Sequence, residues 1–370
     1  PPPAPQGGGR FAFIFSLFLL TQPAYADIII GVAGPMSGQY QAFGAQMKAG
    51  AQAAIDDINA HGGISGELLA LNVADDECDV RKAEAVAHQF VSAGVQVVIG
   101  HFCSNPALAA SKIYETAGII MIAPTASLPL LADGAGWNVV RLASRDDAQA
   151  DAAAAHIQAL QAGAKIGVVD DGTSPNAALT KRFLAALTQK PVLSSQFRAD
   201  GSDFAQVIGK FAAAKLDAIY CACAATDAGN FVNGLRKAGS DARFYGPDSL
   251  ISDAFWERSG EAGNGTEASF TVDPQAAPEA RAAIEVLKAQ GASADGATLP
   301  SYAAVQLFAA GAVENGTGRA KAMADWVKSG VIIHTVLGSL KFDKNGEVQP
   351  PRFVWYEWRA GTYSASTPTP

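Results

Sequence analysis

Residues 97–127 constrain the fold of this chain most strongly. Two short apolar runs, 97–99 and 119–122, flank a stretch with the composition of a helix. Runs of this kind are typical of buried parallel strands. Asn105 is a preferred N-cap residue and Pro106 suits the first helical position, so the segment predicts a strand, a helix and a second strand.

Hydroxyl side chains follow both predicted strands. Ser104 comes after the first strand, and Thr125 and Ser127 come after the second. Parallel sheets place ligand sites at the carboxyl ends of their strands. The N-terminus of the helix between them offers free N–H groups and the positive end of its dipole. The sequence therefore predicts a site for a small anion such as a carboxylate. The alternative is that the two serines only cap helices.

Composition and charge exclude several classes of protein. The chain has 370 residues, of which 49% are hydrophobic, and this length suggests two domains. The formal net charge of −8 argues against nucleic acid and anionic membranes as partners. The sequence contains no motif of a serine hydrolase, a zinc protease or a P-loop ATPase, and its five histidines are scattered. We therefore expect that the protein is not an enzyme and that it has no metal site and no cofactor.

The first 26 residues have the pattern of an export signal. Arg10 precedes the apolar run 11–20, and Ala24-Tyr25-Ala26 matches an A-x-A cleavage site. The run is too short to span a bilayer. We expect cleavage after Ala26 and a mature protein in the periplasm of a Gram-negative cell.

The four cysteines suit this oxidising compartment. Cys78 follows a predicted strand at 69–74 and Cys103 follows the next strand, so we expect the two to form a disulfide. Cys221 and Cys223 are two residues apart in another predicted strand and share one of its faces. We expect both to be buried free thiols that act as small hydrophobic side chains.

The alternation of strands and helices occurs twice along the chain. It runs from Asp27 to about residue 142 and again from about 148 to 245, which predicts doubly wound α/β sheets with right-handed crossovers. After about residue 274, three helices precede two late strands. Residues 364–370 are polar, and we expect a frayed tail.

Five stretches of the mature chain follow one another in a recognisable order and spacing. They are GPMSG at 34–38, DINAHGGI at 57–64, VIGHFCS at 98–104, GIIMIAP at 118–124 and YGPD at 245–248. Together with the pair Cys78 and Cys103 they resemble the type I periplasmic binding proteins of the leucine/isoleucine/valine-binding kind, which serve ABC importers.

The resemblance implies an α/β protein of two doubly wound, Rossmann-like lobes that close on a ligand. Three hinge crossings would join the lobes, near Ser144, Asp273 and Asp343. The expected lobes are residues 27–144 with 274–342, and residues 145–273 with 343–363. The expected partners are a small-molecule ligand and a membrane permease, and we expect the protein to be a monomer.

In similar proteins the ligand is held by its amino-acid backbone. The α-carboxylate binds the positions that match Ser104 and Ser127. The α-ammonium binds the carbonyl that matches Thr125, the hydroxyl of Ser127 and an acid that matches Asp248.

The side-chain pocket departs from the branched-chain pattern. Phe43 stands where a tyrosine commonly lines the pocket, and Pro175 and Ala224 align with tyrosines. We expect the clamp for the amino-acid backbone to be kept and larger aliphatic or aromatic side chains to be admitted. Two alternatives remain, namely a periplasmic ligand-sensing subunit and a binder of a small carboxylate without an amino group.

Overall fold

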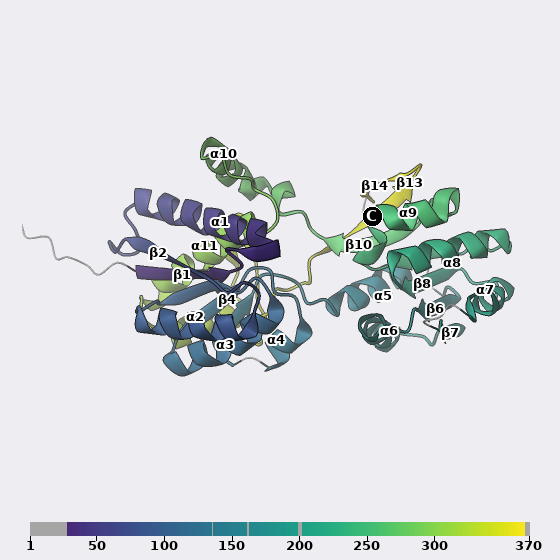
Figure 1. The fold of residues 1–370 in the computed structure, drawn as a ribbon, viewed down its shortest axis with the longest axis horizontal. Helices are drawn as coiled ribbons and strands as arrows, with labels where there is room; N and C mark the ends of the chain where they lie inside the picture. Colours follow the sequence, from purple (N-terminus) through teal and green to yellow (C-terminus); the bar gives the residue numbers. More distant parts are fainter. Residues whose placement is uncertain (1–27, 135, 161–162, 199–201, 367–370) are drawn as a thin grey trace, which may run out of the picture.

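A computed structural model describes residues 28–134, 136–160, 163–198 and 202–366, and two α/β lobes make up this part of the chain (Figure 1). The expected export signal, residues 1–26 with its cleavage site, lies outside the described residues. Within the described ranges, no helix is long and apolar enough to cross a membrane.

The first lobe contains a five-stranded parallel sheet of order β2-β1-β3-β4-β5. Every residue of β3 and β4 is buried, as their continuous apolar runs predict. The strands are β1 (Ile28–Gly34), β2 (Leu69–Asp75), β3 (Val97–Gly100), β4 (Ile120–Ala123) and β5 (Val139–Arg141).

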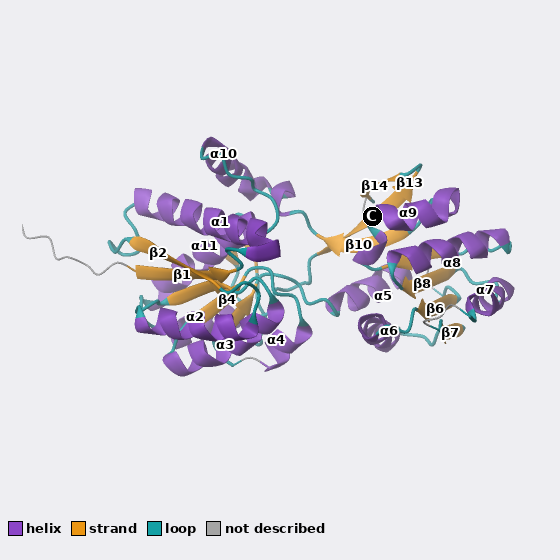
Figure 2. Cartoon of the chain, in the orientation of Figure 1, coloured by secondary structure: helices purple, strands orange, loops and turns teal. Residues whose placement is uncertain are grey.

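Helices cover both faces of this sheet (Figure 2). One face packs against four helices, namely α1 (Gln41–Ala60), α10 (Arg281–Ala289), α11 (Thr298–Asn315) and α12 (Ala320–Lys328). The other face packs against α2 (Val80–Ser92), α3 (Ser104–Ala117) and α4 (Pro129–Gly134). A small hairpin of β11 (Ile333–Thr335) and β12 (Gly338–Leu340) packs into the same core as α1, α10, α11 and α12. The late helices thus complete a core that the early strands begin.

The second lobe contains a seven-stranded mixed sheet of order β14-β13-β10-β9-β8-β6-β7. Five strands are parallel, namely β6 (Ile166–Asp170), β7 (Leu193–Gln196), β8 (Ala218–Ala222), β9 (Arg243–Gly246) and β10 (Glu267–Thr271). Two antiparallel strands follow, β13 (Phe353–Arg359) and β14 (Thr362–Ala365). Residues 364–365 are therefore paired in a strand, although the sequence predicted that the frayed tail begins there.

Helices cover this second sheet as well. One face packs against α5 (Ala148–Leu160) and α6 (Ser174–Ala186). The other packs against α7 (Phe204–Ala213), α8 (Ala225–Lys237) and α9 (Asp253–Ser259).

The chain passes between the two sheets three times, after β5, after β10 and before β13. Residues 343–349 remain with the first lobe, because Glu347 is buried against Arg141 of β5. We therefore propose that the third crossing lies near Arg352 instead of near Asp343.

The first disulfide is as predicted. Cys78 and Cys103 are bonded, with Cα atoms 5.5 Å apart. Their loops follow β2 and β3, which are separated by β1 in the sheet. The cross-link therefore spans the end of β1, the strand that lies between them.

The prediction for the other two cysteines is wrong. Cys221 and Cys223 form a second disulfide, with Cα atoms 5.4 Å apart. Strand β8 ends at Ala222, so Cys223 has left the pleated strand. The turn brings the Cα atoms close to the commonest spacing for a disulfide.

Candidate ligand-binding site

Helix α3 begins directly after Cys103, one of the two cysteines of the first disulfide. Ser104 is its first residue and Cys103 is the N-cap, whereas the sequence predicted Asn105 as the N-cap. The backbone of Cys103 is extended, and its carbonyl already accepts the first helical hydrogen bond, from Ala107 at 3.0 Å. Ser104 thus lies in the first turn, where backbone N–H groups have no partner within the helix.

The loops that follow β3 and β4 are joined by hydrogen bonds. The backbone N–H of Leu128 donates to Ser104 Oγ at 3.2 Å. The hydroxyl of Thr125 donates to the carbonyl of Phe102 at 3.2 Å. Ser127 lies between these two contacts and is half-buried. The structure therefore brings the three predicted hydroxyl residues of the first lobe together.

A buried arginine fixes the loop that carries Ser127. Arg141 Nη1 donates to the carbonyl of Leu128 at 2.7 Å and lies 3.5 Å from the carbonyl of Ala126. Its other nitrogen, Nη2, donates to Glu347 Oε2 at 2.6 Å. One guanidinium thus binds the carbonyls on both sides of Ser127. The sequence reasoning missed this role, although an arginine within a buried strand was the available signal.

Aromatic rings stand beside this half of the site. Phe43, in the first turn of α1, stacks on Phe102 with ring centroids 4.6 Å apart and an interplanar angle of 20°. Tyr40 lies 6.3 Å from Phe102. Phe43 and Tyr40 are 37% and 40% exposed, so they present an apolar wall to solvent.

The second lobe places its three predicted residues at one edge of the sheet. Pro175 is the second residue of α6, Ala224 is the N-cap of α8, and Asp248 begins a short 3₁₀-helix, η2 (Asp248–Leu250). These elements follow β6, β8 and β9, which are neighbours in the sheet. Parallel strands end together, so the three loops meet.

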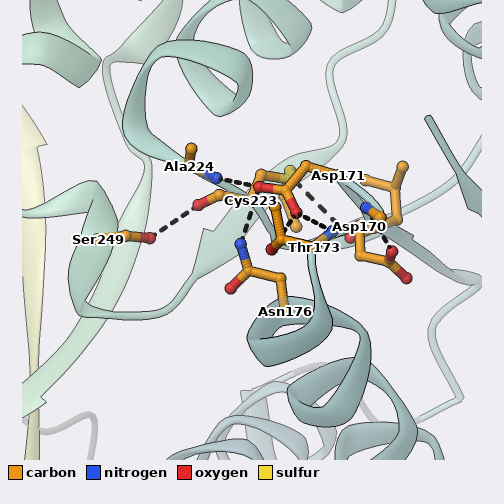
Figure 3. The surroundings of a disulfide bond; sticks show 10 residues. Asp170, Asp171, Thr173, Asn176, Cys223, Ala224 and Ser249 are labelled. Carbon is orange, nitrogen blue, oxygen red and sulfur yellow. Dashed lines mark hydrogen bonds between the residues drawn. A yellow bond between two sulfur atoms is a disulfide. The ribbon is translucent and has the colours of Figure 1, made fainter. Parts of the chain in front are cut away.

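A carboxylate that the sequence reasoning missed links two of these loops. Asp171 accepts hydrogen bonds from Thr173, Asn176 and the backbone N–H of Ala224 (Figure 3). Burial alone would raise the pKa of Asp171, but these hydrogen bonds hold it below the usual value. Asp171 is therefore an ionised anchor of the loop structure.

Asp248 is exposed in this open arrangement of the lobes, and its carboxyl group lies near a second acid, Asp146. The surrounding protein desolvates its carboxyl group and raises the pKa of Asp248, and repulsion from Asp146 raises it further. A hydrogen bond with Gln149 partly offsets these effects. Within the described part of the chain, neither Asp146 nor Asp248 belongs to an ion pair. A cationic group such as an ammonium would relieve this repulsion.

A cavity of about 640 Å³ lies at the hinge and is lined by residues of both lobes. Thr125 lines it, together with Ser144, Asp273 and Arg352 near the crossings. Among the residues predicted to bind the ligand, only Thr125 lines this cavity. The half-site of each lobe is assembled, but among the described residues no hydrogen bond joins the predicted ligand residues of one lobe to those of the other.

The described ranges contain no group of three or more His, Cys, Asp or Glu side chains that could hold a metal ion.

A family model described as periplasmic binding protein matches residues 27–361. An amino acid binding protein of Pseudomonas aeruginosa is 34% identical over 93% of this chain and 94% of its own length. The chain belongs to the periplasmic binding protein family. Leu/Ile/Val-binding protein homolog 1 of Brucella melitensis is 33% identical over 91% of this chain and 92% of its own. The resemblance indicated by the sequence motifs is thus confirmed.

A solved structure has the same fold. An ABC transporter substrate-binding protein from Desulfitobacterium hafniense, crystallised in complex with Leu, matches with a TM-score of 0.70 and 24% identity. The match covers 92% of this chain and all of that one. The family consists of substrate-binding proteins of ABC importers and not of enzymes, as the sequence predicted.

The pair Arg141 and Glu347 generates a stability prediction. Glu347→Gln leaves the buried guanidinium without its counter-charge, so we expect the free energy of unfolding to fall by about 3–5 kcal/mol. Thermal and denaturant unfolding measure this loss. Asp325→Asn is the matched control, because it breaks an exposed pair with Lys321 and should cost less than about 1 kcal/mol. Equal losses in the two variants would contradict a structural role of the buried pair.

Proposed function

We propose that this protein is the periplasmic solute-binding component of an ABC importer, which captures an amino acid between its lobes and delivers it to the membrane permease. The proposal includes a monomer whose leader is cleaved after Ala26. One observation carries it. Hydroxyl groups beside a helix N-terminus lie in one lobe, and the other lobe contains Asp248, a carboxylate that forms no ion pair with any described residue. These two half-sites are complementary to the two charges of an amino acid.

The first lobe supplies the chemistry for the ligand's carboxylate. Ser104 and Ser127 offer hydroxyl donors, and the first turn of α3 adds free N–H groups and the positive end of the helix dipole. Arg141 keeps the Ser127 loop in place, so little ordering is needed when the ligand binds.

The second lobe supplies the counter-charge for the ammonium group. Asp248 would face the ammonium after the lobes close, with the carbonyl of Thr125 and the hydroxyl of Ser127 as further acceptors. Closure removes water, which strengthens the attraction and makes an unpaired charge costly.

The aromatic wall and the missing tyrosines determine which class of ligand side chain the site admits. Phe43 and Phe102 provide a stacked apolar surface, and Pro175 and Ala224 leave space where branched-chain binders carry rings. We therefore propose that larger aliphatic or aromatic amino acids are admitted besides leucine, isoleucine and valine.

Isothermal titration of amino acids tests the role of Asp248. Asp248→Asn should raise the dissociation constant by roughly 30-fold or more, because losing one partner of a buried charge pair costs about 2–5 kcal/mol. Ser104→Ala should cost less, about 1–3 kcal/mol, since the helix N-terminus remains. Asp253→Asn, at an exposed acid at the start of α9, is the control and should bind like the wild type.

Two results would argue against this assignment. The first is tight amino-acid binding by Asp248→Asn. The second is a strong preference of the wild type for a carboxylate without an amino group, which would favour the alternative ligand class.

The raised pKa of Asp248 generates a separate prediction for pH. An ammonium binds the ionised carboxylate, so affinity should be full above the raised pKa of the ligand-free protein and should fall as the pH drops through it. Titrations from neutral to mildly acidic pH measure this decline. Asp248→Asn should lack that part of it, and identical pH profiles of the variant and the wild type would contradict the assignment.

A further inference from the structure

We propose that the Cys221–Cys223 disulfide is a positioning element of the binding site, which holds the three ligand-facing loops of the second lobe in register. The inference rests on the proposed function, because its main readout is amino-acid affinity. It assigns to this cross-link a role in ligand binding instead of a role in overall stability.

The cross-link sits where the central strand of the site ends. Cys221 belongs to β8, and Cys223 is the first residue after the strand. Both side chains are fully buried. Two residues of an extended strand span about 6.6 Å, whereas the Cα atoms of these cysteines lie 5.4 Å apart. The backbone between the two cysteines is therefore shorter than an extended strand, and it leads the chain from β8 to Ala224, the N-cap of α8.

The residue after this turn connects to the loop that follows β6. The backbone N–H of Ala224 donates to Asp171 Oδ2 at 2.7 Å. The same carboxylate accepts from the N–H and hydroxyl of Thr173, at 3.0 and 2.7 Å, and from Asn176 at 2.8 Å. Pro175 lies between these two donors. Figure 3 shows Asp171 enclosed by them beside the disulfide.

The turn also connects to the loop that follows β9. The hydroxyl of Ser249 donates to the carbonyl of Cys223 at 2.8 Å. Ser249 is the neighbour of Asp248 in η2. The single peptide group that joins Cys223 to Ala224 therefore contacts both flanking loops, which carry Pro175 and Asp248.

A role in global stability does not account for this cross-link. The entropy that a disulfide removes from the unfolded chain grows with the loop it closes. Cys78–Cys103 closes a sequence separation of 25 residues, but Cys221–Cys223 closes a separation of only 2. The second bond restricts the unfolded chain far less, so its main effect is on local geometry.

The test compares affinity with stability in one pair of variants. Cys221→Ala with Cys223→Ala removes the cross-link and keeps small apolar side chains in the buried positions. We expect the dissociation constant for leucine to rise about tenfold, equivalent to about 1.4 kcal/mol, and the melting temperature of the ligand-free protein to change little. Amide hydrogen exchange should become faster at 172–176 and 248–250.

Ile219→Val is the matched control. Ile219 is buried in the same strand and the same core cluster but lies away from the strand end. This variant should lower the melting temperature and leave the dissociation constant within about twofold of the wild type. Ser249→Ala removes only the contact with Cys223, so it should weaken leucine binding less than the double variant does. If the double variant does not fold, Ser249→Ala tests whether the contacts around the disulfide support ligand binding.

Three results would overturn the inference. The first is free thiols at these cysteines in unreduced peptide mass spectra of the wild type, and the second is unchanged leucine affinity in the double variant. The third applies if the double variant does not fold, and it is unchanged leucine affinity and unchanged amide exchange in Ser249→Ala. Failure of the wild type to bind any amino acid would instead contradict the proposed function. In that case, the amide exchange of the two loops still decides whether the disulfide holds them.

Discussion

In both lobes the candidate site depends on one geometric constraint, namely that neighbouring parallel strands end at the same edge of their sheet. In the first lobe this constraint gathers the loops after β3 and β4, which carry Ser104, Thr125 and Ser127. In the second it gathers the loops after β6, β8 and β9. Segments far apart in the sequence thereby come within hydrogen-bonding distance of one another.

Each half-site is stabilised by buried charged groups that bind the backbone of its loops. In the first lobe Arg141 binds the carbonyls beside Ser127 and is neutralised by Glu347. In the second, Asp171 collects backbone and side-chain donors from two loops. The loops of each half-site are thus held in place without the ligand, and the repulsion between Asp248 and Asp146 favours a cation between the lobes.

The sequence predicted the elements of this architecture better than its long-range contacts. Local patterns were sufficient for the strand and helix alternation and for the clustering of Ser104 and Ser127. The contact of Arg141 with Glu347 spans 206 positions and depends on how the segment before the third crossing packs against β5. No local pattern contains that information.

The bond between Cys221 and Cys223 was mispredicted for a related reason. The periodicity of a strand assigns both side chains to one face, but it does not fix the residue at which the strand ends. The ligand-binding roles predicted for Ser104, Thr125 and Ser127 in the first lobe, and for Phe43, Pro175, Ala224 and Asp248, remain proposals, because they require the two lobes to meet around a ligand.

Small-angle X-ray scattering of the mature protein with and without leucine tests most directly whether two half-sites on separate lobes form one site. Hinge closure about the three crossings predicts a smaller radius of gyration at saturating leucine. The same change should be absent in Asp248→Asn at a leucine concentration that saturates only the wild type. An unchanged radius of gyration in the wild type, with leucine binding verified by titration, would contradict closure of the lobes on the ligand.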